Sequence, residues 1–120
     1  MKQAAVLGVL VPLLAGCGTA KSPRPVPGGD ADRGARLISH YGCGSCHQIP
    51  GIRGADGRVG PDLGDLARRR LIAGKLTNTP ANLERWIRDP QKVSPGTVMP
   101  DLGVTPAESR DIAAYLYGRT

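Results

Sequence analysis

The stretch Cys43-Gly44-Ser45-Cys46-His47 decides the fold of this chain. Two cysteines three residues apart, followed directly by a histidine, have the spacing that attaches a c-type haem through two thioether bonds. On a helical or near-helical turn, both cysteine side chains lie on one side and each can meet a vinyl group of one porphyrin. The neutral imidazole of His47 then lies under the iron and can bind it as an axial ligand. The motif therefore predicts one covalently attached haem c.

The same cysteine pair has two other interpretations, a thiol-disulfide redox site and half of a zinc site. A thioredoxin-like redox site needs a strand-helix-strand context, which the sequence around Cys43 does not offer. A zinc site would need two further ligands, and the chain has one other histidine, His40. His40 is also the competing candidate for the second axial ligand of a haem. Because it lies three residues before Cys43, on the proximal side, it is poorly placed to reach the opposite haem face, and we expect it to be exposed or hydrogen-bonded near the first helix.

The N-terminal residues have the outline of a lipoprotein signal peptide. Lys2 precedes a mostly apolar run over residues 4–16, shorter than the ~20 apolar residues that cross a bilayer. The sequence Leu14-Ala15-Gly16-Cys17 resembles the lipobox of bacterial lipoproteins, which implies removal of residues 1–16 and lipid attachment at Cys17. The alternative is a plain secretory signal with a chance cysteine. If haem uses the cysteine pair and lipid uses Cys17, no free thiol remains in an oxidising compartment.

Residues 17–29 are then the lipidated cysteine and a Pro- and Gly-rich tether, and residues 30–120 form one domain. At ~3.1 Å per residue the tether can span roughly 35 Å. Two or three acyl chains anchor a protein stably, so we expect an exported protein on the periplasmic side of a bacterial membrane. Without the signal peptide, fifteen basic residues face ten acidic ones, a formal net charge of +5. Nucleic acid does not fit an exported, tethered chain, so the positive field indicates an acidic protein surface as the partner.

Apolar residues at helical spacing, without a convincing alternating run, predict an all-α domain of about four helices with loops wrapped around the haem. The domain has no phenylalanine and few other aromatic residues, so a porphyrin would supply much of its core. Asp30, Thr79 and Thr105 are the expected N-caps of three helices, and Glu108 completes a capping box with Thr105. The expected helices are residues 31–41, a short segment after Pro61, residues 80–89 and residues 106–118.

Met99 is the only methionine left once the signal peptide is removed, and it lies in the loop Ser94-Pro95-Gly96-Thr97-Val98-Met99-Pro100. Two prolines and a glycine can present one side chain at a fixed place. A methionine that fills a gap in the core is the alternative. Because His47 indicates a haem, we predict Met99 as the second axial ligand, which leaves no iron position open for oxygen or substrate.

Over residues 30–118 the chain resembles the class I cytochrome c family. The resemblance is carried by the haem motif, by the loop that ends in Met99, and by Gly60-Pro61-Asp62-Leu63 and Asp111-Ile112-Ala113-Ala114-Tyr115-Leu116. Residues 78–90 and 95–100 are similar to the cytochrome domain fused to subunit II of caa-type haem-copper oxidases. The resemblance does not extend to the copper-binding domain or the transmembrane helices of such a subunit. We therefore expect a free-standing version of that cytochrome domain with a lipid anchor.

The resemblance implies a class I cytochrome c fold and assigns roles around the haem. Pro61 would accept a hydrogen bond from the far ring nitrogen of His47 and so orient the ligand. Trp86 would pack beside the haem near the methionine. Gly34 and Tyr115 would form the close contact where the first and last helices cross.

Two further residues, Arg69 and Asn78, would bond the haem propionates by the same resemblance. Arg69 lies in the run Arg68-Arg69-Arg70, and the sequence leaves open which of the three arginines turns inward.

The expected function is outer-sphere electron transfer by a membrane-tethered monohaem cytochrome, either a monomer or a subunit of a complex. The family implies a route from a quinol-oxidising complex, or another periplasmic donor, to a terminal oxidase through a small, weak interface. One alternative is an electron-transfer subunit of a larger dehydrogenase or reductase. The other is a haem sensor or peroxidase-like enzyme, if Met99 does not bind. The sequence has no recognisable hydrolytic triad, phosphate-binding glycine loop or pair of catalytic carboxylates, so we expect an electron carrier rather than an enzyme.

Overall fold

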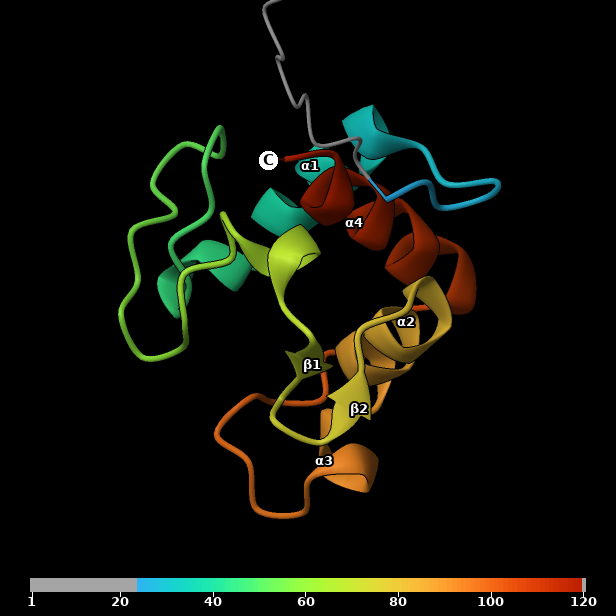
Figure 1. The fold of residues 1–120 in the computed structure, drawn as a ribbon. Helices are drawn as coiled ribbons and strands as arrows, with labels where there is room; N and C mark the ends of the chain where they lie inside the picture. Colours follow the sequence, from blue (N-terminus) through green and yellow to red (C-terminus); the bar gives the residue numbers. More distant parts are fainter. Residues whose placement is uncertain (1–23, 120) are drawn as a thin grey trace, which may run out of the picture.

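Three α-helices carry most of the core in the computed structural model, which describes residues 24–119 (Figure 1). They are α1 (Ala31–His40), α2 (Pro80–Arg88) and α4 (Pro106–Gly118). The smaller elements are two 3-10 helices, η1 (Cys43–Ser45) and η2 (Leu66–Arg68), the strands β1 (Leu71–Ile72) and β2 (Leu76–Thr77), and the short helix α3 (Pro90–Val93). None of the helices in the described residues is long and apolar enough to cross a membrane. The predicted signal peptide and Cys17 lie outside the described residues.

The three predicted N-caps are confirmed. The side chains of Asp30, Thr79 and Thr105 accept hydrogen bonds from the backbone N–H three residues later, at 2.9, 3.2 and 3.3 Å. Each bond satisfies a donor that the first helical turn leaves without an intrahelical partner. The sequence placed the end of the second long helix correctly but missed α3, which begins directly at Pro90 because proline is compatible with a first helical position.

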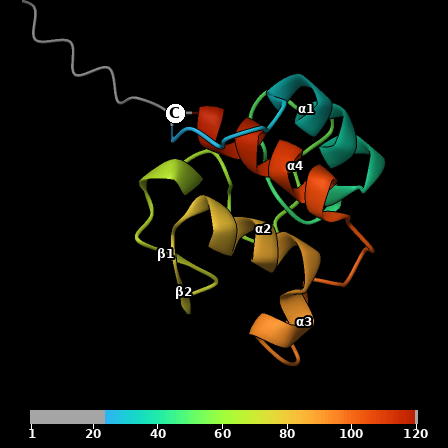
Figure 2. The same ribbon diagram turned by 90° about the vertical axis from the view of Figure 1, so that its right-hand side faces the viewer.

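Helix α4 lies between α1 and α2 (Figure 2). A Cβ atom added at Gly34 in α1 would lie only 2.1 Å from the carbonyl oxygen of Asp111 and 3.1 Å from the Cβ atom of Tyr115 in α4. The predicted close contact between Gly34 and Tyr115 is therefore confirmed. The buried apolar core comprises Ile38, Ile49, Leu66, Ala67, Ile72, Leu83, Ile87, Val104, Ile112, Ala113, Tyr115, Leu116 and Tyr117.

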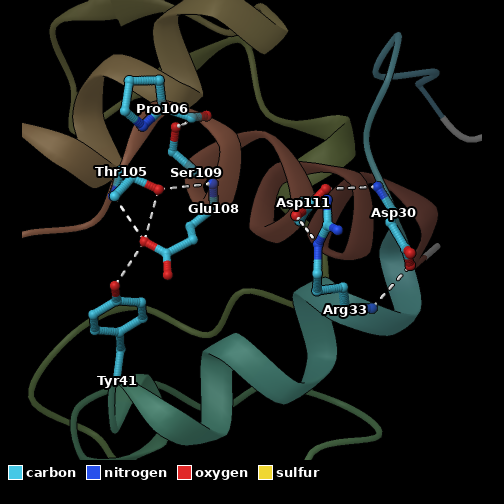
Figure 3. Close-up of polar contacts among 8 residues, drawn as sticks. All are labelled: Asp30, Arg33, Tyr41, Thr105, Pro106, Glu108, Ser109 and Asp111. Atoms are coloured by element: carbon cyan, nitrogen blue, oxygen red, sulfur yellow. Dashed lines mark hydrogen bonds and ion pairs between the residues drawn. The ribbon is translucent and has the colours of Figure 1, made fainter.

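A buried carboxylate joins the start of α1 to α4 (Figure 3). Asp111 is 1% exposed, and its side chain accepts hydrogen bonds from the backbone N–H of Asp30 at 2.8 Å and from Nε of Arg33 at 2.5 Å. The hydrogen bond from Arg33 is the main reason why the pKa of Asp111 lies below its ordinary value. The ionised carboxylate thus stabilises the helix crossing from within the core.

A second polar contact joins the other end of α1 to the start of α4 (Figure 3). Oε2 of Glu108 accepts hydrogen bonds from the backbone N–H of Thr105 at 2.9 Å, from the Thr105 hydroxyl at 2.8 Å and from the Tyr41 hydroxyl at 2.8 Å. These donors, the Thr105 N–H first, hold the pKa of Glu108 below its usual range. The predicted capping box is present, and Tyr41 extends it to α1.

The segment over residues 24–29 packs against the domain, although the sequence assigned it to the tether. Nε of Arg24 donates to the carbonyl oxygen of Ala67 at 2.8 Å, and Nη1 donates to the carbonyl oxygen of Asn78 at 2.5 Å. The guanidinium also lies 5.9 Å from the ring centroid of Tyr117, within the range of a cation-π contact. The folded unit therefore includes Arg24, because the side chain caps carbonyl groups of two distant segments.

Within residues 24–119, a small hairpin adds β structure to the predicted all-α class. Strand β1 pairs antiparallel with β2, with Leu71 opposite Thr77 and Ile72 opposite Leu76. The turn between them has positive φ at Ala73 (+52°) and Gly74 (+67°). Strands of two residues are too short for an alternating pattern, which explains why the sequence did not reveal them.

Candidate haem-binding site

A cavity of about 570 Å³ lies between the Cys43–Ser45 turn, α2, α4 and the loop that precedes α4. This volume is in the range of about 300–1,000 Å³ that small-molecule and cofactor sites occupy. Its lining is mostly aliphatic, with side chains from α2 and α4 forming one wall. Seven of the eight cofactor-binding residues predicted from the sequence line it: Cys43, Cys46, His47, Pro61, Arg69, Trp86 and Met99.

The cysteine pair occupies a tight turn at one side of the cavity. The backbone N–H groups of Cys46 and His47 both donate to the carbonyl oxygen of Cys43, at 3.3 and 3.1 Å, which brings the three side chains to one region. Gly44 is required here, since an added Cβ would lie 2.6 Å from the Cα atom of Ala55. Both thiols are half-buried and unpaired.

The thiol chemistry of this turn does not favour the two other interpretations of the motif. Burial raises the pKa of the Cys43 thiol, whereas a redox-active Cys-x-x-Cys site lowers the pKa of its nucleophilic cysteine. Within residues 24–119, no group of three or more His, Cys, Asp or Glu side chains is arranged to hold a metal ion. A zinc site built on the pair is therefore not supported.

The imidazole of His47 is held in one orientation by the next segment of chain. Its Nδ1 atom lies 2.7 Å from the carbonyl oxygen of Pro61. Because a carbonyl only accepts, Nδ1 carries the proton and Nε2 keeps a free lone pair for a metal. A Cβ atom at Gly60 would lie 2.3 Å from Cε1 of His47, so glycine is needed beside the ring. His40 is exposed at the end of α1, as expected, and its ring lies against Tyr41 without lining the cavity.

Met99 reaches the same cavity from the loop that precedes α4. It is half-buried, and its neighbours Thr97, Val98 and Pro100 also line the cavity. The backbone of this loop is held by Gln91, whose side-chain amide donates to the carbonyl oxygen of Met99 at 2.9 Å. Sequence reasoning missed Gln91, because a side chain that bonds the backbone of a loop leaves no periodic signal.

Arg69 is the arginine of the run 68–70 that lines the cavity, whereas Arg68 and Arg70 are exposed. Its guanidinium donates to a carboxylate oxygen of Asp65 at 2.6 Å and to the carbonyl oxygen of Asp62. The hydrogen bond from Arg69 lowers the pKa of Asp65. The side chain is therefore at the cavity but already has an anionic partner.

Asn78 is the predicted residue that the structure does not bring to the cavity. It is 3% exposed, and Nδ2 donates to the carbonyl oxygens of Leu66 and Arg69, both at 2.8 Å. Its Oδ1 accepts a hydrogen bond from the hydroxyl of the fully buried Tyr117. A propionate contact by Asn78 would require one of these bonds to break. The amide instead holds the 3-10 turn and Arg69 in place.

These residues fit a covalently bound haem. Two thiols and an imidazole with an unprotonated Nε2 share a large apolar cavity with a thioether sulfur. Two cysteines three residues apart on one turn, followed directly by a histidine, define a c-type cytochrome. Residues 31–119 match the family model of cytochrome c, and the chain belongs to the cytochrome c family. The protein accordingly binds haem c through Cys43 and Cys46 and is a monohaem electron carrier.

Relatives of known sequence are longer proteins. Cytochrome c oxidase subunit 2 of Alkalihalophilus pseudofirmus is 40% identical over 70 residues, which are 58% of this chain and 20% of that protein. The subunit of the same name from Bacillus subtilis is 29% identical over 89 residues, 72% of this chain and 25% of that protein. The chain thus spans about a fifth to a quarter of the length of these relatives.

Solved structures of single cytochromes match almost over their whole length. Cytochrome cH from Methylobacterium extorquens is 30% identical with a TM-score of 0.57, and the match covers 73% of this chain and 97% of that chain. Cytochrome c2 from Rhodobacter sphaeroides is 20% identical with a TM-score of 0.54, over 73% of this chain and 94% of that chain. The predicted class I cytochrome c fold is confirmed.

Proposed function

We propose that this cytochrome is tethered to a membrane and carries single electrons between respiratory complexes, with His47 and Met99 as the two axial ligands of its haem. The observation that carries the proposal is that one apolar cavity has both side chains on its lining, with Nε2 of His47 free to bind a metal. Imidazole and thioether ligation of the same iron favours a high reduction potential and closes both axial positions to oxygen and substrate.

Each residue of the site has a defined task in this proposal. Cys43 and Cys46 hold the porphyrin, and the Pro61 carbonyl keeps the proton of His47 on Nδ1. Met99 would supply the second ligand to the iron, and the aliphatic walls would exclude water from the site. When bound, the haem supplies a one-electron ferric/ferrous couple. The protein needs no catalytic acid, base or nucleophile for this function.

The expected route is from a quinol-oxidising complex, or another periplasmic donor, to a terminal oxidase. Support for the acceptor comes from the relatives that are named as subunits of cytochrome c oxidase. The formal net charge of +5 without the signal peptide, fifteen basic against ten acidic residues, supports attraction to an acidic partner surface. If the route is right, membranes without this cytochrome will oxidise quinol more slowly than normal membranes, and adding the holoprotein back will restore the rate.

The tether in this proposal is shorter than the sequence predicted. Because Arg24 is bonded to the folded domain, residues 18–23 remain between Cys17 and the domain. At ~3.1 Å per residue an extended segment of this length spans roughly 19 Å, about half the distance expected from the sequence. A Cys17→Ser variant should move from the membrane to the soluble fraction, whereas a soluble wild type would exclude the anchor.

An electron-transfer subunit of a larger complex is the second candidate. The observation in its favour is that the same domain is part of an oxidase subunit in the relatives. Purification in a mild detergent separates the two candidates. A mobile carrier elutes alone, whereas a subunit elutes with its enzyme at fixed stoichiometry.

The ligation is tested by absorption spectra of oxidised and reduced holoprotein, with and without carbon monoxide, made in a host that attaches haem c. Wild type should have a ferric sulfur-to-iron band and should not shift with carbon monoxide. Met99→Ala should lose the band and bind carbon monoxide, and the matched His40→Ala variant should behave as wild type. Carbon monoxide binding by the wild type would contradict Met99 ligation and favour a sensor or peroxidase-like protein.

A further inference from the structure

Gln91 in α3 binds the loop of residues 94–100, which we call the Met99 loop, through every polar atom of its side chain. Its Nε2 atom donates to the carbonyl oxygens of Thr97 at 2.8 Å and Met99 at 2.9 Å. Its Oε1 atom accepts a hydrogen bond from the backbone N–H of Gly96 at 3.2 Å. One half-buried side chain thus makes three of the contacts that fix this loop.

The orientation of this amide follows from its partners. Two carbonyl oxygens can only accept, so the amino group must face Thr97 and Met99, and the carbonyl end must face the N–H of Gly96. Neither a carboxylate nor a shorter side chain can make the same set of bonds. The requirement is therefore for glutamine at this position and not merely for a polar residue.

The Gln91 side chain acts on the backbone of Met99 itself. Besides the bond from Gln91, the Met99 backbone has a weak contact from its N–H to the Thr97 hydroxyl at 3.4 Å. Elsewhere in the loop, the backbone N–H of Thr97 donates to the carbonyl oxygen of Ser94 at 3.0 Å, and Val98 and Pro100 line the cavity. Loss of the amide would remove the three side-chain hydrogen bonds that join α3 to the Met99 loop, and loops with fewer restraints open first.

We propose that Gln91 is a positioning residue that holds Met99 against the haem iron and sets the rate at which the methionine leaves it. This inference rests on the proposed ligation by His47 and Met99. Gln91 does not itself line the cavity and touches no reacting atom, so it acts through the backbone of Gly96, Thr97 and Met99. Its effect is therefore on the lifetime of the methionine-bound state.

Stopped-flow binding of imidazole to the ferric holoprotein measures this lifetime. Imidazole can enter only after Met99 has left, so the observed rate reaches a limit at high imidazole that equals the rate of methionine dissociation. Removing hydrogen bonds that each contribute a factor of roughly two to ten should raise this limit by about tenfold or more in Gln91→Ala. Gln91→Glu keeps the size of the side chain but sets a carboxylate against two carbonyl oxygens, so its limit should rise at least as much.

The matched control is Lys92→Ala, on the same short helix, because Lys92 is exposed and, among residues 24–119, its side chain pairs only with Asp89, at 3.2 Å. Its limiting rate and its sulfur-to-iron band should equal those of wild type. If the limiting rate of imidazole binding is the same in both Gln91 variants as in wild type, the proposed role of Gln91 is wrong. The role is also wrong if Lys92→Ala raises the limiting rate as much as Gln91→Ala does. If the wild type has no limiting rate and no sulfur-to-iron band, the ligation by Met99 fails, and this inference fails with it.

Discussion

The crossing of α1 and α4 and the Met99 loop are stabilised in opposite ways. At the crossing, the backbone of α4 fills the space where a Gly34 side chain would be, and the carboxylate of Asp111 is buried with two donors. The Met99 loop has exposed side chains and depends largely on the hydrogen bonds of Gln91. The comparison separates a scaffold fixed by excluded volume from a loop, carrying the proposed ligand Met99, that is fixed by a few exchangeable bonds. We therefore expect mutations at the crossing to change global stability and mutations in the loop to change ligation.

Breaking the crossing should have the largest effect. In Gly34→Ala the new methyl group would lie 2.1 Å from a backbone oxygen of α4, so the helices must move apart. We expect the free energy of unfolding of the holoprotein to fall by about 3 kcal/mol or more, measured by urea denaturation. Gly118→Ala is the control, because no described atom lies within 4 Å of its added Cβ, and it should change stability by less than about 0.5 kcal/mol. Equal stability of the two variants would mean that the crossing is not tightly packed.

The buried carboxylate of Asp111 at the crossing should make the stability of the protein depend on pH. Because the pKa of Asp111 in the folded protein lies below its ordinary value, the ionised carboxylate stabilises the fold above about pH 4. This contribution is lost as the pH falls through the pKa of Asp111 in the folded protein.

The experiment is urea denaturation of Asp111→Asn at a series of pH values. We expect its free energy of unfolding to lie about 2 kcal/mol below that of wild type at pH 7 and to approach wild type in strong acid. Asp32→Asn, at an exposed position in the first turn of α1, is the control and should cost less than about 0.5 kcal/mol at pH 7. Parallel profiles of Asp111→Asn and wild type would contradict the assignment.

Much of the scaffold could be predicted from the sequence because its determinants are local. The N-caps follow from residue types at fixed offsets, and the haem motif specifies its own turn. The contact between Gly34 and Tyr115 came from the family resemblance and agrees with the structure. The sequence also placed Met99 in a loop, and the structure brings that loop to the same cavity as His47.

The walls of the site were less predictable because they depend on residues far apart in the chain. Asn78 is 39 residues from Tyr117 and 54 residues from Arg24, and each of these pairs is hydrogen-bonded. No pattern within one segment reveals such a pair. For this reason the sequence predicted neither the buried contacts of Asn78 nor the packing of residues 24–29 against the domain.

The next prediction concerns the buried hydrogen bond between Tyr117 and Asn78. Tyr117→Phe keeps the ring but leaves Oδ1 of the buried Asn78 without its donor, which should cost about 1–2 kcal/mol. Burial raises the pKa of Tyr117 to about 12. Wild type should therefore lose stability as the pH rises above about 10, and Tyr117→Phe should lose less. Tyr115→Phe is the control, since its hydroxyl bonds the carbonyl oxygen of the exposed Pro50, which water can reach. An equal cost for the two tyrosines would contradict the special role of the buried pair.

Substitutions in the hairpin turn beside the cavity should have the smallest effect on stability, and unlike Gly34→Ala they act through backbone conformation. Ala73 lines the cavity with a φ of +52°, a conformation that costs a residue with a Cβ about 1 kcal/mol or more. Ala73→Gly removes this strain but gives the unfolded chain more freedom, so the net gain should be at most about 0.5 kcal/mol by urea denaturation. Gly74→Ala, at a φ of +67°, is the reverse change and should destabilise by about 1 kcal/mol. Effects of the same sign in both variants would show that backbone strain does not govern this turn. Opposite signs would mean that the rim of the cavity responds to backbone conformation, whereas the helix crossing responds to excluded volume.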